Sequence, residues 1–77
     1  MLEQEIVFGK FLKERRNQLK LTTAQLASKI GYKNISKGIR RITAIEKGEI
    51  EPELTEKLMT LLEVTTEDRA KCFENEI

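Results

Sequence analysis

The chain has 77 residues, 39% of them apolar and only one a proline, with a formal net charge of +1, so we expect one globular domain over residues 1–77 rather than a disordered chain. No apolar run approaches the roughly 18 residues that a membrane span needs, and the acidic start of the chain does not fit a secretion signal, so a cytoplasmic location is expected. The sequence holds no histidine and the single Cys72, which excludes an internal disulfide and a structural zinc site.

The first predicted helix spans about residues 3–20. At 100° per residue, Phe8, Leu12 and Leu19 fall on one face and predict the side that packs into the core. Arg15 and Arg16 lie at the edges of this apolar face, an unusual place for charged residues.

A second helix is predicted over about Thr23 to Ile30. Thr22 and Gln25 have the spacing of a capping box, in which each side chain bonds to the backbone amide of the other residue. Gly31 suits the left-handed position that ends a helix.

The third predicted helix begins near Asn34 and covers about residues 34–47. Ile35, Ile39 and Ile42 form an apolar ridge with Glu46 at its centre, and Gly38 marks a possible kink. Gly48 ends the helix. The opposite side is basic and polar and contains no acid; its members are Ser36, Lys37, Arg40, Arg41, Thr43, Ala44 and Lys47.

Two more helices complete an all-α prediction of five helices. Pro52 suits the first turn of the fourth helix, and leucines at 54, 58, 61 and 62 supply its core side. The pattern Thr65–Asp68 predicts a second cap, followed by a helix over about 66–75 with Ala70 and Phe73 inward.

Charge is distributed unevenly along the chain. Residues 1–48 hold eleven basic and four acidic side chains, or +7, whereas residues 49–77 hold three basic and nine acidic ones, or −6. This polarity favours one surface for a polyanion and another for solvent or a partner. The acidic C-terminal half, including Phe73 and Ile77, is the candidate surface for a homodimer.

Four stretches, taken together, resemble a known family. Residues 8–16, 21–27, 42–48 and 52–54 (FGKFLKERR, LTTAQLA, ITAIEKG and PEL) are similar to the phage repressor and Cro (XRE-type) helix-turn-helix domain, over about residues 6–64. The resemblance implies a lambda-repressor-like fold in which the third helix enters the major groove of double-stranded DNA. It also implies an ion pair between Arg16 and Glu46, for which Arg15 is a geometric competitor.

The sequence differs from the family at two places. Thr23 stands where the family usually has a glutamine that touches phosphate, and its hydroxyl can still donate to a phosphate oxygen. Gly31 and Gly48 are seventeen positions apart, which is more than the family usually has. Either the third helix gains a turn, or the connection before it is longer.

We therefore expect a sequence-specific, DNA-binding transcriptional regulator of bacterial or phage type that acts as a homodimer. Bases would be contacted by Lys37, Arg40, Arg41 and Thr43, and phosphates by Thr23, Lys33, Asn34 and Ser36. The alternative is a protein-interaction module that keeps the helix-turn-helix fold without binding DNA. Enzyme activity, a metal and a cofactor are not expected, because the acidic cluster at 49–53 is better explained as a solvated linker than as an acid–base pair.

Overall fold

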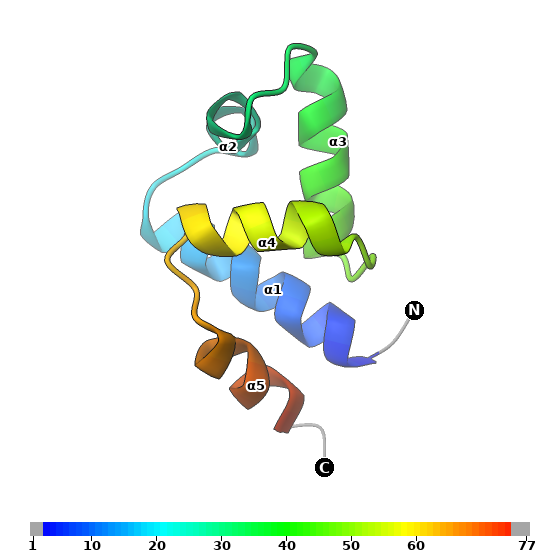
Figure 1. Ribbon diagram of the computed structural model, residues 1–77, viewed down its shortest axis with the longest axis vertical. Helices are drawn as coiled ribbons and strands as arrows, with labels where there is room; N and C mark the ends of the chain where they lie inside the picture. Colours follow the sequence, from blue (N-terminus) through cyan, green and yellow to red (C-terminus); the bar gives the residue numbers. More distant parts are fainter. Residues whose placement is uncertain (1–2, 75–77) are drawn as a thin grey trace.

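A computed structural model describes residues 3–74 of the chain, which form five helices and no strand (Figure 1). The helices are α1 (Glu3–Gln18), α2 (Thr23–Ile30), α3 (Ile35–Glu46), α4 (Pro52–Leu61) and α5 (Thr66–Glu74). The all-α prediction with five helices is confirmed. None of these helices combines the length and the apolar character that a membrane crossing requires.

The start of α2 has the predicted cap. The Thr22 hydroxyl accepts a hydrogen bond from the Gln25 amide at 3.0 Å, and the Gln25 side-chain oxygen accepts one from the Thr22 amide at 2.8 Å. Two amides that the helix itself cannot satisfy are thereby bonded, which fixes the residue at which α2 begins.

The end of α2 answers the question that the spacing of the two glycines raised. Gly31 takes a left-handed φ of 107°, and the following amide, of Tyr32, donates to the Ala27 carbonyl at 3.1 Å. Only residues 31–34 connect α2 to α3. The additional length before Gly48 therefore belongs to α3 and not to a longer connection.

Gly38 brings α3 close to α2 instead of kinking it. The helix runs unbroken through this position after the Asn34 side chain caps it by accepting from the Lys37 amide at 3.1 Å. A Cβ on Gly38 would lie 2.6 Å from the Ala27 Cβ and 2.8 Å from Cδ2 of Tyr32. Because only a residue without a side chain fits there, the glycine sets how closely α3 packs on α2.

A second glycine performs the same role where α1 meets the other end of α3. A Cβ on Gly9 would lie 2.6 Å from the Glu46 carbonyl oxygen. The backbones of α1 and α3 therefore touch near the C-terminus of α3, whereas α2 supports its N-terminal half. The position of α3 is thus fixed at two points along its length.

All five helices contribute to one apolar core. α4 packs mainly against α2, and α5 packs against α1, where the Arg69 guanidinium lies 5.2 Å from the centre of the Phe8 ring. The buried apolar side chains are Phe8, Leu12, Leu26, Ala27, Ile42, Ile45, Leu54, Leu58, Met59, Leu62, Val64 and Cys72.

The structure corrects the predictions for α1 and α3. α1 ends at Gln18, two residues early, because Lys20 turns the chain with a φ of 58°. Leu19 is consequently 37% exposed, and Leu21 packs against the core in its place. In α3 the fully buried isoleucines are Ile42 and Ile45, while the two predicted ridge residues Ile35 and Ile39 are half-buried.

α5 also differs from its prediction. Ala70 is exposed, because the helix turns Arg69 and Cys72 toward α1 and the core. The side chain of Phe73 and the whole of Ile77 lie outside the described residues, so their predicted contribution to a dimer surface stays a prediction.

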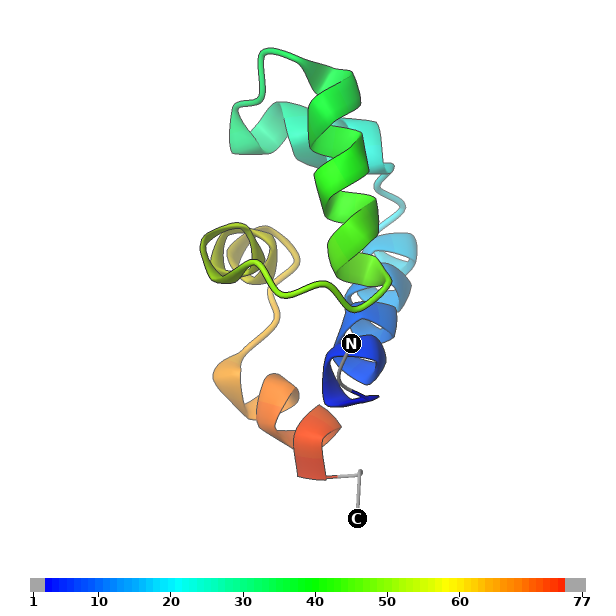
Figure 2. The same cartoon turned by 90° about the vertical axis from the view of Figure 1, so that its right-hand side faces the viewer.

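The molecule is elongated, with extents of 40 × 24 × 19 Å. Figures 1 and 2 place α2 and α3 together at one end and α5 at the other, with α1 and α4 between them. α2 is seen almost end-on beside the upright α3 in Figure 1 and runs across it in Figure 2, so the two helices cross steeply.

Candidate nucleic-acid interface

The outward side of α3 is a basic and polar stripe. Ser36, Lys37, Arg40 and Lys47 are exposed along it, and Thr43 is half-buried at its edge. A helix of 12 residues is about 18 Å long. The stripe thus presents a cationic ridge that extends along the full length of one helix.

The one acid of α3 is turned away from this stripe. Arg16 of α1 binds the Glu46 carboxylate through two nitrogens, Nε to Oε2 at 2.8 Å and Nη2 to Oε1 at 3.3 Å. The side chains are 12% and 7% exposed. The remaining Nη1 of Arg16 donates to the Leu21 carbonyl at 3.0 Å. This nearly buried pair therefore ties α1, the α1–α2 connection and the end of α3 together.

Arg15, the competitor for that role, binds elsewhere. Its Nε donates to the Leu62 carbonyl at 3.0 Å and its Nη2 to the Glu63 carbonyl at 3.2 Å. Both acceptors lie in the turn after α4, where the helix leaves carbonyls unpaired. The two neighbouring arginines thus join α1 to two different parts of the fold.

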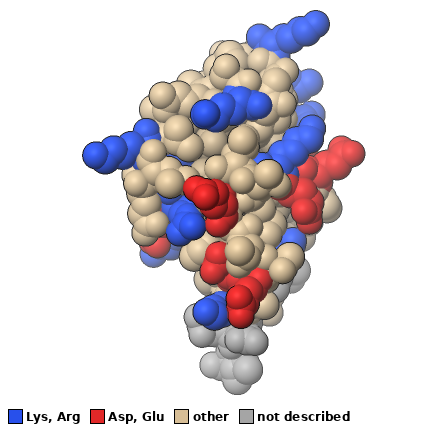
Figure 3. All heavy atoms as spheres, turned by 60° about the vertical axis from the view of Figure 1, so that its left-hand side comes forward, with Lys and Arg blue, Asp and Glu red and all other residues tan. Residues whose placement is uncertain are grey.

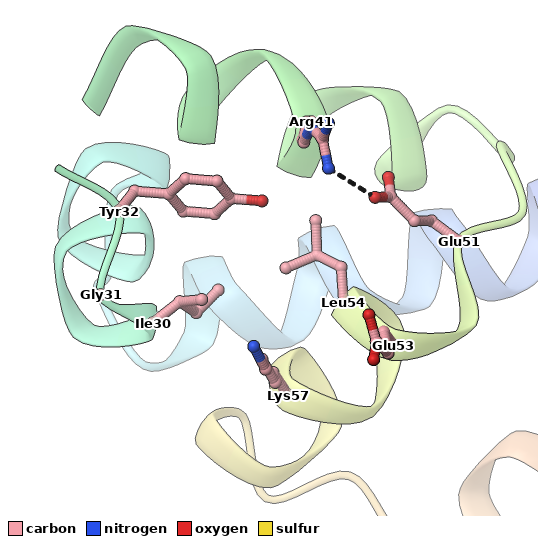
Figure 4. Close-up of a pocket in the computed structure, with 8 residues that line it drawn as sticks. All are labelled: Ile30, Gly31, Tyr32, Arg41, Glu51, Glu53, Leu54 and Lys57. Atoms are coloured by element: carbon pink, nitrogen blue, oxygen red, sulfur yellow. Dashed lines mark hydrogen bonds and ion pairs between the residues drawn. The ribbon is translucent and has the colours of Figure 1, made fainter. Parts of the chain in front are cut away.

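Arg41 lies on the flank of the stripe and is partly neutralised. Its Nη1 is 2.9 Å from Oε1 of Glu51, in an ion pair whose side chains are 46% and 37% exposed. Figure 4 shows the two side chains meeting at the rim of a hollow that Tyr32 and Leu54 also line. By contrast, among the residues that the structure describes, Lys37 and Arg40 have no carboxylate within ion-pair distance.

The predicted phosphate contacts gather near the N-terminal end of α3. Lys33 and Asn34 are exposed in the connection between α2 and α3, although the Asn34 side chain is engaged as a cap. Thr23 is the first residue of α2 and is half-buried. Its neighbour Thr22 uses its hydroxyl for the capping box.

The surface charge follows the long axis of the molecule. On the face that Figure 3 shows, lysine and arginine atoms dominate the upper part, the end formed by α2 and α3, while the lower part carries acidic and basic atoms together. α2 and α3 both belong to the half of the sequence that carries +7. A field of one sign at one end attracts an extended polyanion and orients it toward that end.

No known protein family, curated protein or solved structure matches this chain. Within residues 3–74, no three His, Cys, Asp or Glu side chains converge into a group that could hold a metal ion. The geometry and charge of the interface itself therefore carry the functional argument.

Sequence reasoning missed the part played by Glu49 and Glu51. Both were interpreted as solvated linker residues, yet Glu51 binds Arg41 and both carboxylates lie beside the basic stripe. Arg41 and Glu51 are ten positions apart and do not lie on one helix, so helical periodicity could not predict their contact. The available signal was Gly48 itself, because a glycine after a helix suits a left-handed turn, and in the structure it takes a φ of 109° where the chain leaves α3.

Proposed function

We propose that the chain is a sequence-specific DNA-binding regulator of the phage repressor and Cro type, with the lambda-repressor-like arrangement that the sequence resemblance implies. The observation that carries the proposal is the outward stripe of α3, which is cationic, exposed and free of acids within the helix. Glu46, the one acid of α3, lies on the inner side of the helix, where Arg16 binds it.

The mechanism follows from size and chemistry. A major groove about 12 Å wide admits one helix, and in this proposal α3 lies in it. Lys37 and Arg40 donate to guanine edges, and Thr43 contacts a base at the rim of the stripe. Arg41, on the opposite flank beside Glu51, contacts phosphate in this proposal instead of the base expected from the sequence. Ser36, Lys33 and Asn34 reach the phosphates beside the N-terminal half of α3, and Thr23 reaches them from the start of α2.

Regulation in this proposal is by occupancy of an operator or promoter. A homodimer would place two α3 helices one helical turn of DNA apart, on a site of matching symmetry. The two copies would be joined through the acidic end of the molecule, which is the end away from the stripe.

Fluorescence polarisation with a labelled duplex, titrated over about 50 to 200 mM salt, tests the proposal. We expect affinity to fall steeply with salt, and Lys37→Ala and Arg40→Ala each to weaken binding. Replacing a residue that contacts phosphate lowers the slope of affinity against salt by about 1. Replacing a residue that reads bases weakens binding mainly to the preferred sequence.

Lys71→Ala on α5 is the matched control, because it removes the same charge at the opposite end of the molecule and should leave binding unchanged. Equal loss in all three variants, or no binding by the wild-type protein at low salt, would refute the proposal.

One observation favours the alternative of a protein-interaction module without DNA binding. Glu49 and Glu51 place two negative charges beside the stripe, where phosphates would approach. If that alternative holds, the wild-type chain shows no salt-dependent affinity for any duplex, and the stripe with its acidic border binds a partner protein of mixed charge.

A further inference from the structure

The segment after α3 borders the stripe with carboxylates. Glu49 and Glu51 line the same surface hollow as Lys37, Arg40 and Arg41. Glu49 also lines an adjoining hollow that runs along α3 from Ser36 to Lys47. The acids that the sequence places outside α3 thus lie within the electrostatic reach of its cations.

Glu49 is held in this place by backbone hydrogen bonds. The Gly48 amide donates to the Ile45 carbonyl at 2.9 Å, and the Glu49 amide donates to the Ala44 carbonyl at 3.0 Å. Together with the left-handed Gly48, these bonds form a Schellman motif. The position of Glu49 at the end of α3 is therefore set by the helix terminus itself.

Glu51 is held from the other side, by α4. It is the N-cap residue of that helix, Pro52 follows it, and its carbonyl accepts from the Thr55 amide at 2.9 Å. N-cap side chains usually bond to amides of their own helix, as Thr22 and Asn34 do in α2 and α3. The Glu51 side chain makes no such bond and accepts from Arg41 instead.

From this arrangement we propose that Glu49 and Glu51 act as an electrostatic brake on α3, reducing its affinity for DNA of any sequence. The inference rests on the proposed function and identifies the residues that limit the affinity of α3 for DNA. Glu51 competes with phosphate for the Arg41 guanidinium, and Glu49 repels phosphates that approach the C-terminal half of the stripe.

The brake acts on the sequence-independent part of binding. Non-specific affinity comes almost entirely from phosphate contacts, whereas sequence is read at base edges. Carboxylates beside the stripe therefore penalise every duplex equally, and only a site with good base contacts overcomes them. Because the Arg41–Glu51 pair is exposed, it is weak enough for a bound operator to displace it.

The test compares Glu49→Gln and Glu51→Gln with Glu56→Gln, an exposed glutamate on α4 that loses the same charge away from the stripe. The probes are a mixed-sequence duplex and a duplex selected from a random pool by wild-type protein. Each of the first two variants should bind the mixed-sequence duplex roughly two- to fivefold more tightly, with the gain fading at high salt. The affinity for the selected duplex should rise by a similar factor, so the ratio of the two affinities should stay unchanged.

A double-mutant cycle tests whether Glu51 acts through Arg41. In an Arg41→Ala background, Glu51→Gln should gain less than it does in the wild type, because the competition for the guanidinium is gone. Circular dichroism melting of each variant should show that all are equally folded, because the replaced side chains are exposed.

The failures are distinguishable. If wild-type protein binds DNA but Glu51→Gln and Glu49→Gln gain no more than Glu56→Gln, the brake is refuted and the proposed function stands. If neither wild type nor any variant binds a duplex at low salt, both the proposed function and the brake are refuted.

Discussion

Removing one partner of the Arg16–Glu46 ion pair should be among the most destabilising changes to a polar contact in this fold. The pair's nitrogen–oxygen distance of 2.8 Å is close to the 2.9 Å of the Arg41–Glu51 pair, but its side chains are 12% and 7% exposed against 46% and 37%. The two pairs therefore separate the effect of burial from the effect of distance.

Replacing Arg16 by Met leaves the Glu46 carboxylate nearly buried and without its partner, and leaves the Leu21 carbonyl without its side-chain donor. Removing one partner of a buried pair costs about 3 to 5 kcal/mol. Because the pair retains some exposure, we expect a loss of about 3 kcal/mol. A chain of 77 residues has roughly 4 to 11 kcal/mol in total, so this change removes a large fraction of the stability.

The double variant Arg16→Met/Glu46→Leu removes both charges and keeps the fold measurable. Apolar replacement of a whole buried pair is often neutral, and the lost bond to Leu21 costs about 1 kcal/mol. We therefore expect the double variant to be more stable than Arg16→Met alone. Urea unfolding, followed by far-ultraviolet circular dichroism, measures each free energy.

The exposed pair is the control. Arg41→Met should change the free energy of unfolding by no more than about 1 kcal/mol. The reasoning is refuted if Arg16→Met costs as little as Arg41→Met, or if the effects of the Arg16 and Glu46 substitutions simply add in the double variant.

Three further outcomes follow from the structure. Gly38→Ala should destabilise the chain by on the order of 1 kcal/mol in urea unfolding, because the clash of its Cβ with the Ala27 Cβ and the Tyr32 ring outweighs the gain in helix propensity; a stabilised variant would contradict this. The backbone amide of Thr65, followed by its hydroxyl, lowers the pKa of Asp68 below its ordinary 3.8. The ionised carboxylate therefore stabilises the fold above pH 3.8, and this stabilisation is lost as the pH falls through the lowered pKa of the folded state. The difference in melting temperature between wild type and Asp68→Asn should shrink in acid, and a constant difference would exclude the effect. Burial, with a smaller contribution from the charge of Asp68, raises the pKa of the Cys72 thiol, so a thiol reagent should label it far more slowly in the native protein than in urea, and equal rates would contradict the burial.

Local signals in the sequence predicted the helices well. The Thr22–Gln25 and Thr65–Asp68 caps and the turn glycine Gly31 depend on neighbouring residues, and the structure contains all three features. Leu19 was predicted wrongly because periodicity assumes that a helix continues, whereas Lys20 turns the chain out of it.

Contacts between distant residues were harder to predict. The role of Gly38 depends on Ala27 and Tyr32, which only the packing of α2 against α3 brings to it. Arg41 and Glu51 meet because the chain turns back at Gly48, and no periodic pattern contains that information. The Arg16–Glu46 pair was expected only through the resemblance to a family.

The central claim is that the outward stripe of α3 is the surface that binds DNA. Nuclear magnetic resonance of the ¹⁵N-labelled protein, titrated with a short duplex, tests it most directly, because each backbone amide reports separately. The account predicts that the largest shifts fall on residues 33–47 and the start of α2, while α5 stays unchanged. Shifts concentrated on α5, or spread evenly over all five helices, would contradict it.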